Sequence, residues 1–349
     1  MEAATILRQP ETDVAESRCA AQLPPSFWRE ALAPYAQPDL RRSIIDLLTS
    51  VVPFLLLTIA MYALAGVSVP LVLAMSIPAA GFLVRTFIVF HDCTHGSFLP
   101  SRDWNRRVGI LCGLLVYTPF HPWRFEHAVH HATAGDLEAR GKGDVETMTV
   151  AEYQAMSWLG RLGYRLMRNP VVMLGVGPIW ALMINPRFVP AWARERFARH
   201  ILLTDVVLVA AIAGLVALFG WQDVLLIQLP SAMIAGAAGI WMFYVQHQFE
   251  GVLWDRKPDW NYTAAALQGS SYLKLPKVLQ FFTGNIGLHH VHHLSARIPN
   301  YNLQRAHDEN EVFREVPVLS GWEAVKTFRL KLIDEETNEL VGFKALRGR

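Results

Sequence analysis

Long apolar runs dominate the hydrophobic pattern of the chain. Four of them are long enough to cross a bilayer as helices, which takes roughly 20 residues: residues 47–66, 67–90, 201–220 and 224–245. The first and fourth contain no charged residue, the second contains only Arg85 and the third only Asp205. Because short connections join the first run to the second and the third to the fourth, the pattern predicts two transmembrane helical hairpins.

The rest of the chain is less apolar. Two shorter runs, residues 108–118 and 170–185, predict buried or interfacial helices. Residues 1–42 contain scattered acidic side chains and no apolar core, so they are not a signal peptide. We expect them to form an N-terminal arm, with residues 24–42 as an amphipathic lead-in to the membrane. Residues 43–349 are then one all-α membrane domain, with a helical cytoplasmic cap from about residues 91–200 and 246–349.

Composition and charge place this domain in a membrane. Hydrophobic residues make up 52% of the chain and charged residues 18%, which is a low share for a soluble protein. The two hairpin connections contain no Lys or Arg, and the positive-inside rule therefore puts them outside and the basic remainder in the cytoplasm. We expect an integral protein of a bacterial cytoplasmic (inner) membrane. Arg85 lies near the cytoplasmic end of its span, and we expect its side chain to reach the interface rather than pair with an acidic group.

Nine of the thirteen histidines fall into three short clusters, with the patterns HxxxH, HxxHH and HxxHH. Residues three and four apart share a helix face, so each cluster directs several imidazoles one way. Imidazole nitrogen suits Zn, Cu, Fe and Ni, and so many ligands exceed the need of one ion. All three clusters lie on the predicted cytoplasmic side. The pattern predicts a polynuclear, nitrogen-rich metal centre in the cap.

Several metal chemistries do not match the sequence. No HExxH occurs, as zinc proteases often have, and no Glu has a His three residues on, as in soluble di-iron bundles. A haem protein would place histidines inside the spans. Cys19, Cys93 and Cys112 form no zinc spacing and no disulfide framework. The kind of centre that still matches the sequence is a histidine-rich site for a redox-active, non-haem metal such as iron.

The clusters also resemble a known family. His91-Asp92-Cys93-Thr94-His95, Trp123-Arg124-x-x-His127-x-x-His130-His131 and Gly284-Asn285-Ile286-Gly287-x-His289-x-x-His292-His293 look like the three histidine boxes of membrane fatty acid desaturases. Arg297-Ile298-Pro299-Asn300-Tyr301 and Tyr244-Val245-Gln246-His247-Gln248 resemble the acyl-lipid branch, which includes bacterial Δ5- and Δ12-type enzymes.

The resemblance implies a non-haem centre of two iron ions with O2 as co-substrate. Its implied ligands are His91, His95, His127, His130, His131, His247, His289, His292 and His293. In some animal members an Asn lies one turn before the equivalent of His247, whereas this chain has Phe243 there. Asn285, one turn before His289, faces the metals or is an ordinary hydrogen-bonding residue.

Other polar residues near the boxes have two interpretations. Asp92 accepts a hydrogen bond from a ligating imidazole or is a surface charge. Asp136 and Asp144 support the ligands or shape a loop, and Trp123 and Arg124 brace the second box or mark the interface. His290 does not fit the HxxHH spacing and is expected to pack off the ligand face. We expect surface or interface positions for His121, His200 and His307.

The function implied is insertion of a cis double bond into fatty acyl chains of membrane lipids. No His-Pro-Gly-Gly segment of a fused cytochrome and no iron–sulfur cysteine pattern is present, so electrons come from an external donor such as ferredoxin. We expect no nucleic-acid partner. Two alternatives stay open: a fatty acyl hydroxylase, epoxygenase or carotenoid-modifying oxygenase on the same scaffold, and a non-catalytic membrane metal binder.

Overall fold

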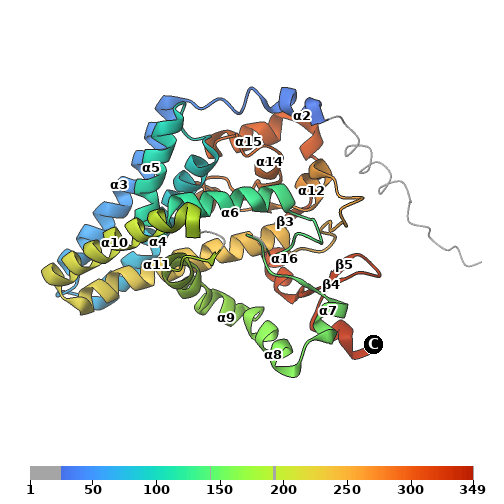
Figure 1. The fold of residues 1–349 in the computed structure, drawn as a ribbon. Coiled ribbons are helices and arrows are strands. Elements are labelled where there is room, and N and C mark those ends of the chain that lie inside the picture. Colours follow the sequence, from blue (N-terminus) through green and yellow to red (C-terminus); the bar gives the residue numbers. More distant parts are fainter. Residues whose placement is uncertain (1–24, 142, 192–193, 349) are drawn as a thin grey trace, which may run out of the picture.

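The computed structural model describes residues 25–141, 143–191 and 194–348, and its largest elements are four long helices (Figure 1). They are α3 (Leu40–Leu64), α4 (Val69–His95), α10 (Arg194–Phe219) and α11 (Trp221–His247), each long and apolar enough to cross a membrane. They coincide with the four predicted spans, although each begins or ends beyond its apolar run. Residues 1–24 of the predicted arm, with Cys19, lie outside the described residues.

Local sequence signals set the ends of these helices. The Asp39 side chain accepts a hydrogen bond from the Arg42 N–H at the start of α3, and the Ser68 hydroxyl accepts one from the Leu71 N–H at the start of α4. Gly96 ends α4 with φ +71°, and Gly220 joins α10 to α11 with φ +84°, a backbone region that favours glycine. The chain therefore reverses sharply at residues 65–68 and 220, which gives the two predicted hairpins.

Helix α4 lies at the centre of the bundle. It packs against α3, α11 and α5 (Arg102–Leu115), and its second half is almost wholly buried. Glycine allows the approach of α5: a Cβ on Gly113 would lie 2.6 Å from the Thr118 carbonyl oxygen and 3.1 Å from the Phe90 ring. The second half of α4, which leads into the first histidine box, is thus fixed by packing on three sides.

The outer surface of the bundle is apolar. Large hydrophobic side chains are exposed along α3 and α10, among them Leu56, Ile59, Leu202, Val206 and Val209. In water such a continuous patch would be unfavourable, whereas in a bilayer these side chains contact lipid. The prediction of an integral membrane protein with four helical spans is consistent with this surface.

The cap consists of residues 96–191 and 248–348, as far as they are described. Besides α5 its α-helices are α6 (Phe120–Thr133), α7 (Val150–Ala155), α8 (Trp158–Met167), α9 (Pro170–Gly175), α12 (Tyr262–Gln268), α13 (Lys277–Phe282), α14 (His289–Leu294), α15 (Asn300–Glu309) and α16 (Gly321–Lys326). Shorter helical turns are η1 (Ile179–Ile184), η2 (Asn185–Arg187), η4 (Glu311–Phe313), η5 (Thr327–Arg329) and η6 (Phe343–Gly348). In Figure 1, α12, α14 and α15 gather at the end of the bundle away from the hairpin connections.

The described residues are mainly helical, as predicted, and the five strands among them are very short. β1 (Met148–Thr149) pairs in parallel with β4 (Leu332–Asp334), which pairs antiparallel with β5 (Glu339–Val341). β2 (Tyr272–Lys274) and β3 (Val318–Ser320) form a second, parallel pair. Segments of two or three residues show no sequence periodicity, so these strands could not be predicted.

The segment before the first span packs on the cap. α2 (Pro25–Leu32) buries Trp28, and the Tyr35 hydroxyl donates to Glu309 Oε2 over 2.7 Å. Arg42 donates to Asn302 Oδ1 over 2.8 Å. Tyr35 and Arg42 therefore have their hydrogen-bond partners on α15, and the amphipathic lead-in to the membrane stays a prediction.

Candidate metal centre

Four helices bring together the nine histidines named as ligands. The last turn of α4 presents His91 and His95, and α11 ends at His247. The other six are on the short cap helices α6 and α14: His127, His130, His131, His289, His292 and His293. Eight of the nine are buried, and His95 is partly buried. The three boxes, distant in sequence, therefore converge at one end of the bundle.

The nine imidazoles form two groups. In each group every histidine offers one ring nitrogen, and these nitrogens all lie within 4.8 Å of one another. Group one is His91, His95, His127, His131 and His292. Group two is His130, His247, His289 and His293. The second and third boxes each contribute to both groups, so the two candidate metal positions share helices and are adjacent.

The nitrogen positions fit a metal better than they fit hydrogen bonding. In group two, Nε2 of His289 lies 2.9 Å from Nε2 of His247 and 3.1 Å from Nε2 of His293. Two nitrogens bound at right angles to one ion, each about 2.1 Å from it, would be about 3.0 Å apart. Nε2 of His95 and of His292 are buried with no hydrogen-bond partner among the described residues. Lone pairs directed at a shared point are the donor set that a metal ion needs.

The protonation states also suit metal binding. Burial, and then the neighbouring imidazoles, lower the pKa of six cap histidines well below its usual range: His127, His130, His131, His289, His292 and His293. These side chains are therefore neutral at pH 7. Neutral imidazole is the form that binds a metal ion.

Contacts around the groups orient individual rings. His91 Nδ1 lies 3.0 Å from Asp92 Oδ1, and His247 Nδ1 lies 3.2 Å from the Gly269 carbonyl oxygen. The Trp123 ring stacks on His127 with 4.4 Å between ring centroids. In each case the contact is made by Nδ1 or by a face of the ring, so Nε2 of the same histidine stays directed toward the other nitrogens of its group.

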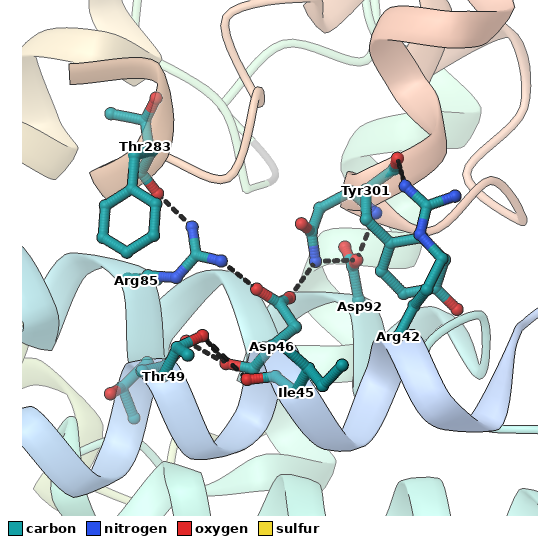
Figure 2. A network of polar contacts seen from close by, with 12 residues as sticks. Arg42, Ile45, Asp46, Thr49, Arg85, Asp92, Thr283 and Tyr301 are labelled. Carbon is teal, nitrogen blue, oxygen red and sulfur yellow. Dashed lines mark hydrogen bonds and ion pairs between the residues drawn. The ribbon is translucent and has the colours of Figure 1, made fainter. Parts of the chain in front are cut away.

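Asp92, on α4, also belongs to a polar network that includes residues of α3 and α15 (Figure 2). Its Oδ2 accepts from the backbone N–H of Asn300 over 2.7 Å and from the Asn300 side chain over 3.0 Å. The same amide donates to Asp46 Oδ2 over 2.9 Å, and Arg85 donates to Asp46 Oδ1. The chain of contacts joins α3 and α15 to the first histidine box on α4.

This network corrects the expectation for Arg85. Its guanidinium pairs with the carboxylate of Asp46 (Figure 2), an acidic partner that we did not expect, and it also donates to the Phe281 carbonyl oxygen. The reason is that Asp46, one helix away, offers a buried countercharge inside the bundle. Sequence reasoning missed Asp46 and Asn300, although an Asp and an Arg on the two helices of one predicted hairpin were a detectable signal.

The remaining histidines pair with one another outside both groups. His290 is fully buried on α14, and its Nε2 lies 3.0 Å from His307 Nδ1. His121 and His200 approach to 4.0 Å between ring centroids. The expected packing role of His290 agrees with its position. His307, expected at the surface, is instead half-buried as its partner.

Some of the other residues near the histidine boxes lie against imidazole rings, and others stabilise loops. Asp144 Oδ1 lies 4.0 Å from His130 Nδ1, and Phe243 packs against the rings of both His130 and His247. Asp136 instead caps a turn by accepting the Glu138 N–H. Asn285 has φ +58°, and its N–H donates to the Gln280 carbonyl oxygen in the turn before α14. This left-handed conformation gives Asn285 a backbone role at that position.

Comparison with known proteins places the chain in a clear context. The family model described as fatty acid desaturase matches residues 66–318. A fatty acid desaturase of Bacillus subtilis (strain 168) is 43% identical over 316 residues, 90% of each chain. In Synechocystis, an sn-1 oleoyl-lipid 12-desaturase is 30% identical over 237 residues, 64% of each chain. An sn-1 acyl-lipid omega-3 desaturase (ferredoxin) of the same organism is 27% identical over 232 residues, 63% of this chain and 62% of its own length.

Proposed function

The chain belongs to the fatty acid desaturase family, and we propose that it uses two iron ions and O2 to introduce a cis double bond into acyl chains of membrane lipids. The observation that carries this proposal is the pair of adjacent histidine groups at the end of a membrane-spanning bundle. Desaturase is favoured over hydroxylase, epoxygenase and carotenoid-modifying enzyme, because the relatives described above are named as desaturases.

The chain's own residues would bind and position the irons. Groups one and two supply five and four imidazole nitrogens. Iron bound there would supply the redox chemistry that removes hydrogen from an unactivated methylene, which no side chain can do. The protein's part is to fix the ligands, and Asp92, Gly269 and Trp123 do so by engaging the far side of His91, His247 and His127.

The overall electron balance requires a partner. Forming one double bond releases two electrons from the substrate, and reduction of O2 to two waters takes four, so two come from a donor. One cyanobacterial relative bears ferredoxin in its name, and a ferredoxin-like protein is the donor that we propose here. The basic residues on the side of the bundle with the boxes support a cytoplasmic metal centre in a bacterial inner membrane.

Fatty-acid analysis tests the activity. The full chain is expressed in a host that lacks desaturases but contains ferredoxin and its reductase, and double bonds are located by mass spectrometry. We expect a new cis-unsaturated acyl chain in membrane lipids that is absent with the empty vector. Hydroxylated or epoxidised chains, or an unchanged profile with folded, iron-loaded protein, would contradict the proposal.

Asp92→Asn tests the support of His91. We expect a 10- to 100-fold loss of iron affinity or of desaturation rate, the usual cost of removing a partner of a metal ligand. Asp103→Asn is the matched control, because Asp103 is exposed on α5 and pairs with Arg106 only on the surface. Iron per folded protein and rate are measured for both variants. Equal values for the two would show that Asp92 does not position a ligand.

A further inference from the structure

Helix α8 has an apolar face that no described part of the chain covers. Trp158 is 70% exposed and Leu159 60%, and Leu162, Leu166 and Met167 are also exposed. The following helix, α9, packs on the membrane-spanning α11, while α8 continues away from the four long helices (Figure 1). A helix with one apolar face, tethered beside a span, has the features of a helix that lies in the bilayer interface.

A hollow of about 760 Å³ lies beside this face. It is formed by α7, α8 and η6, and its lining includes three aromatic residues, Tyr153, Trp158 and Phe343, and three cations, Arg161, Arg165 and Lys344. Arg161 and Arg165 are one helical turn apart and so project on the same side of α8. The hollow is therefore lined by cations from α8 and η6, and Trp158 and Leu162 make it continuous with the apolar face.

The cations are oriented but not neutralised. Arg165 Nε donates to the Tyr153 hydroxyl over 2.6 Å, and its guanidinium lies 4.7 Å from the Phe343 ring centroid. Arg161 Nε donates to the Met156 carbonyl oxygen over 3.1 Å. Within the described ranges no carboxylate lies within 4 Å of either arginine or of Lys344. Three positive charges around one hollow leave a site for an anion.

We propose that this hollow binds the phosphate of a membrane phospholipid, whose acyl chains lie along the exposed face of α8. A phosphate group matches the two guanidinium groups and the ammonium group. The apolar face of α8 favours a phospholipid over free phosphate, because the acyl chains of a lipid can cover this face and a phosphate ion cannot. An acidic protein donor would also satisfy the charge, but an exposed apolar helix face tethered to a membrane-spanning bundle favours a lipid. The inference depends on the membrane placement of the chain and not on its catalytic activity.

Lipid binding by the metal-loaded full chain tests the site directly. Binding of dioctanoyl phosphatidylglycerol is measured in detergent by native mass spectrometry and by thermal shift, for wild type and the triple variant R161Q/R165Q/K344Q. Each basic residue near an anionic lipid contributes about 1 kcal/mol to the free energy of binding. We therefore expect the triple variant to bind this lipid at least about tenfold more weakly than the wild type does. K274Q/R314Q/K326Q is the matched control, since it removes the same charge from exposed residues away from the hollow.

Further arms separate the lipid from other ligands. Dioctanoyl glycerol, which lacks phosphate, and inorganic phosphate are each expected to bind at least about tenfold more weakly than the phospholipid. Equal binding of inorganic phosphate, or equal lipid affinity in both triple variants, would overturn the proposal. So would unchanged lipid binding with slower reduction by ferredoxin, which would make the hollow a donor site. None of these binding measurements requires catalytic turnover. If the protein binds phospholipid but does not desaturate acyl chains, the proposed function is refuted and the lipid site is not.

Discussion

Replacing His292 with alanine is expected to abolish desaturation and to remove iron from the protein. His292 is one of the five histidines of group one, it is 1% exposed, and its Nε2 has no hydrogen-bond partner among the described residues. The variant lacks one of the five nitrogens of group one, so the ion there is bound less tightly. The other residues of α14 are unchanged and can keep its packing. The variant is purified, its iron is measured per folded protein, and its product is measured by fatty-acid analysis.

His290→Ala is the matched control for this experiment. His290 is two residues away on the same helix and equally buried, but it pairs with His307 and belongs to neither group. We expect it to reduce stability while iron per folded protein and specific activity stay near the wild-type values. A His292→Ala variant that keeps both iron and activity, or a His290→Ala variant that loses both, would contradict the assignment of ligands.

Replacing Asp46 with leucine is expected to destabilise the bundle by about 3–5 kcal/mol. That is the usual cost of removing one partner of a buried ion pair, because the remaining charge is left uncompensated. Here the remaining charge is Arg85, whose side chain is 12% exposed. The free energy of unfolding is measured in detergent for Asp46→Leu, Arg85→Met and the double variant.

The double variant separates the lost charge from the lost pair. Once both charges are replaced by apolar side chains, no buried charge is left unpaired, and such replacements are often neutral. We therefore expect the double variant to be more stable than Asp46→Leu. Strictly additive destabilisation would show that the two side chains do not interact. Because Asn300 joins Asp46 to Asp92, Asp46→Leu is also expected to lower the rate.

The spans and the candidate ligands were predictable because both depend on local spacing. A run of about 20 apolar residues is sufficient to identify a span, and histidines three and four apart must share a helix face. His247 was found only through the resemblance, because it stands alone in sequence. The single-turn helix α14 still presents His289, His292 and His293 together, as the spacing requires.

The division into two groups was not predictable. His130 and His131 are neighbours in the chain but fall into different groups, because successive helix residues are rotated about the axis and their rings reach different parts of the same face of α6. The Arg85–Asp46 pair depends on how α3 and α4 are aligned within their hairpin, and neither apolar run specifies that alignment. Such features arise from tertiary packing, which hydrophobic periodicity does not describe.

Iron-edge anomalous diffraction from crystals of the metal-loaded protein tests the central claim most directly. We expect two anomalous peaks. One would be surrounded by His91, His95, His127, His131 and His292, and the other by His130, His247, His289 and His293. A single peak, or signal at the zinc edge instead of the iron edge, would contradict the assignment of a two-iron desaturase centre to these nine histidines.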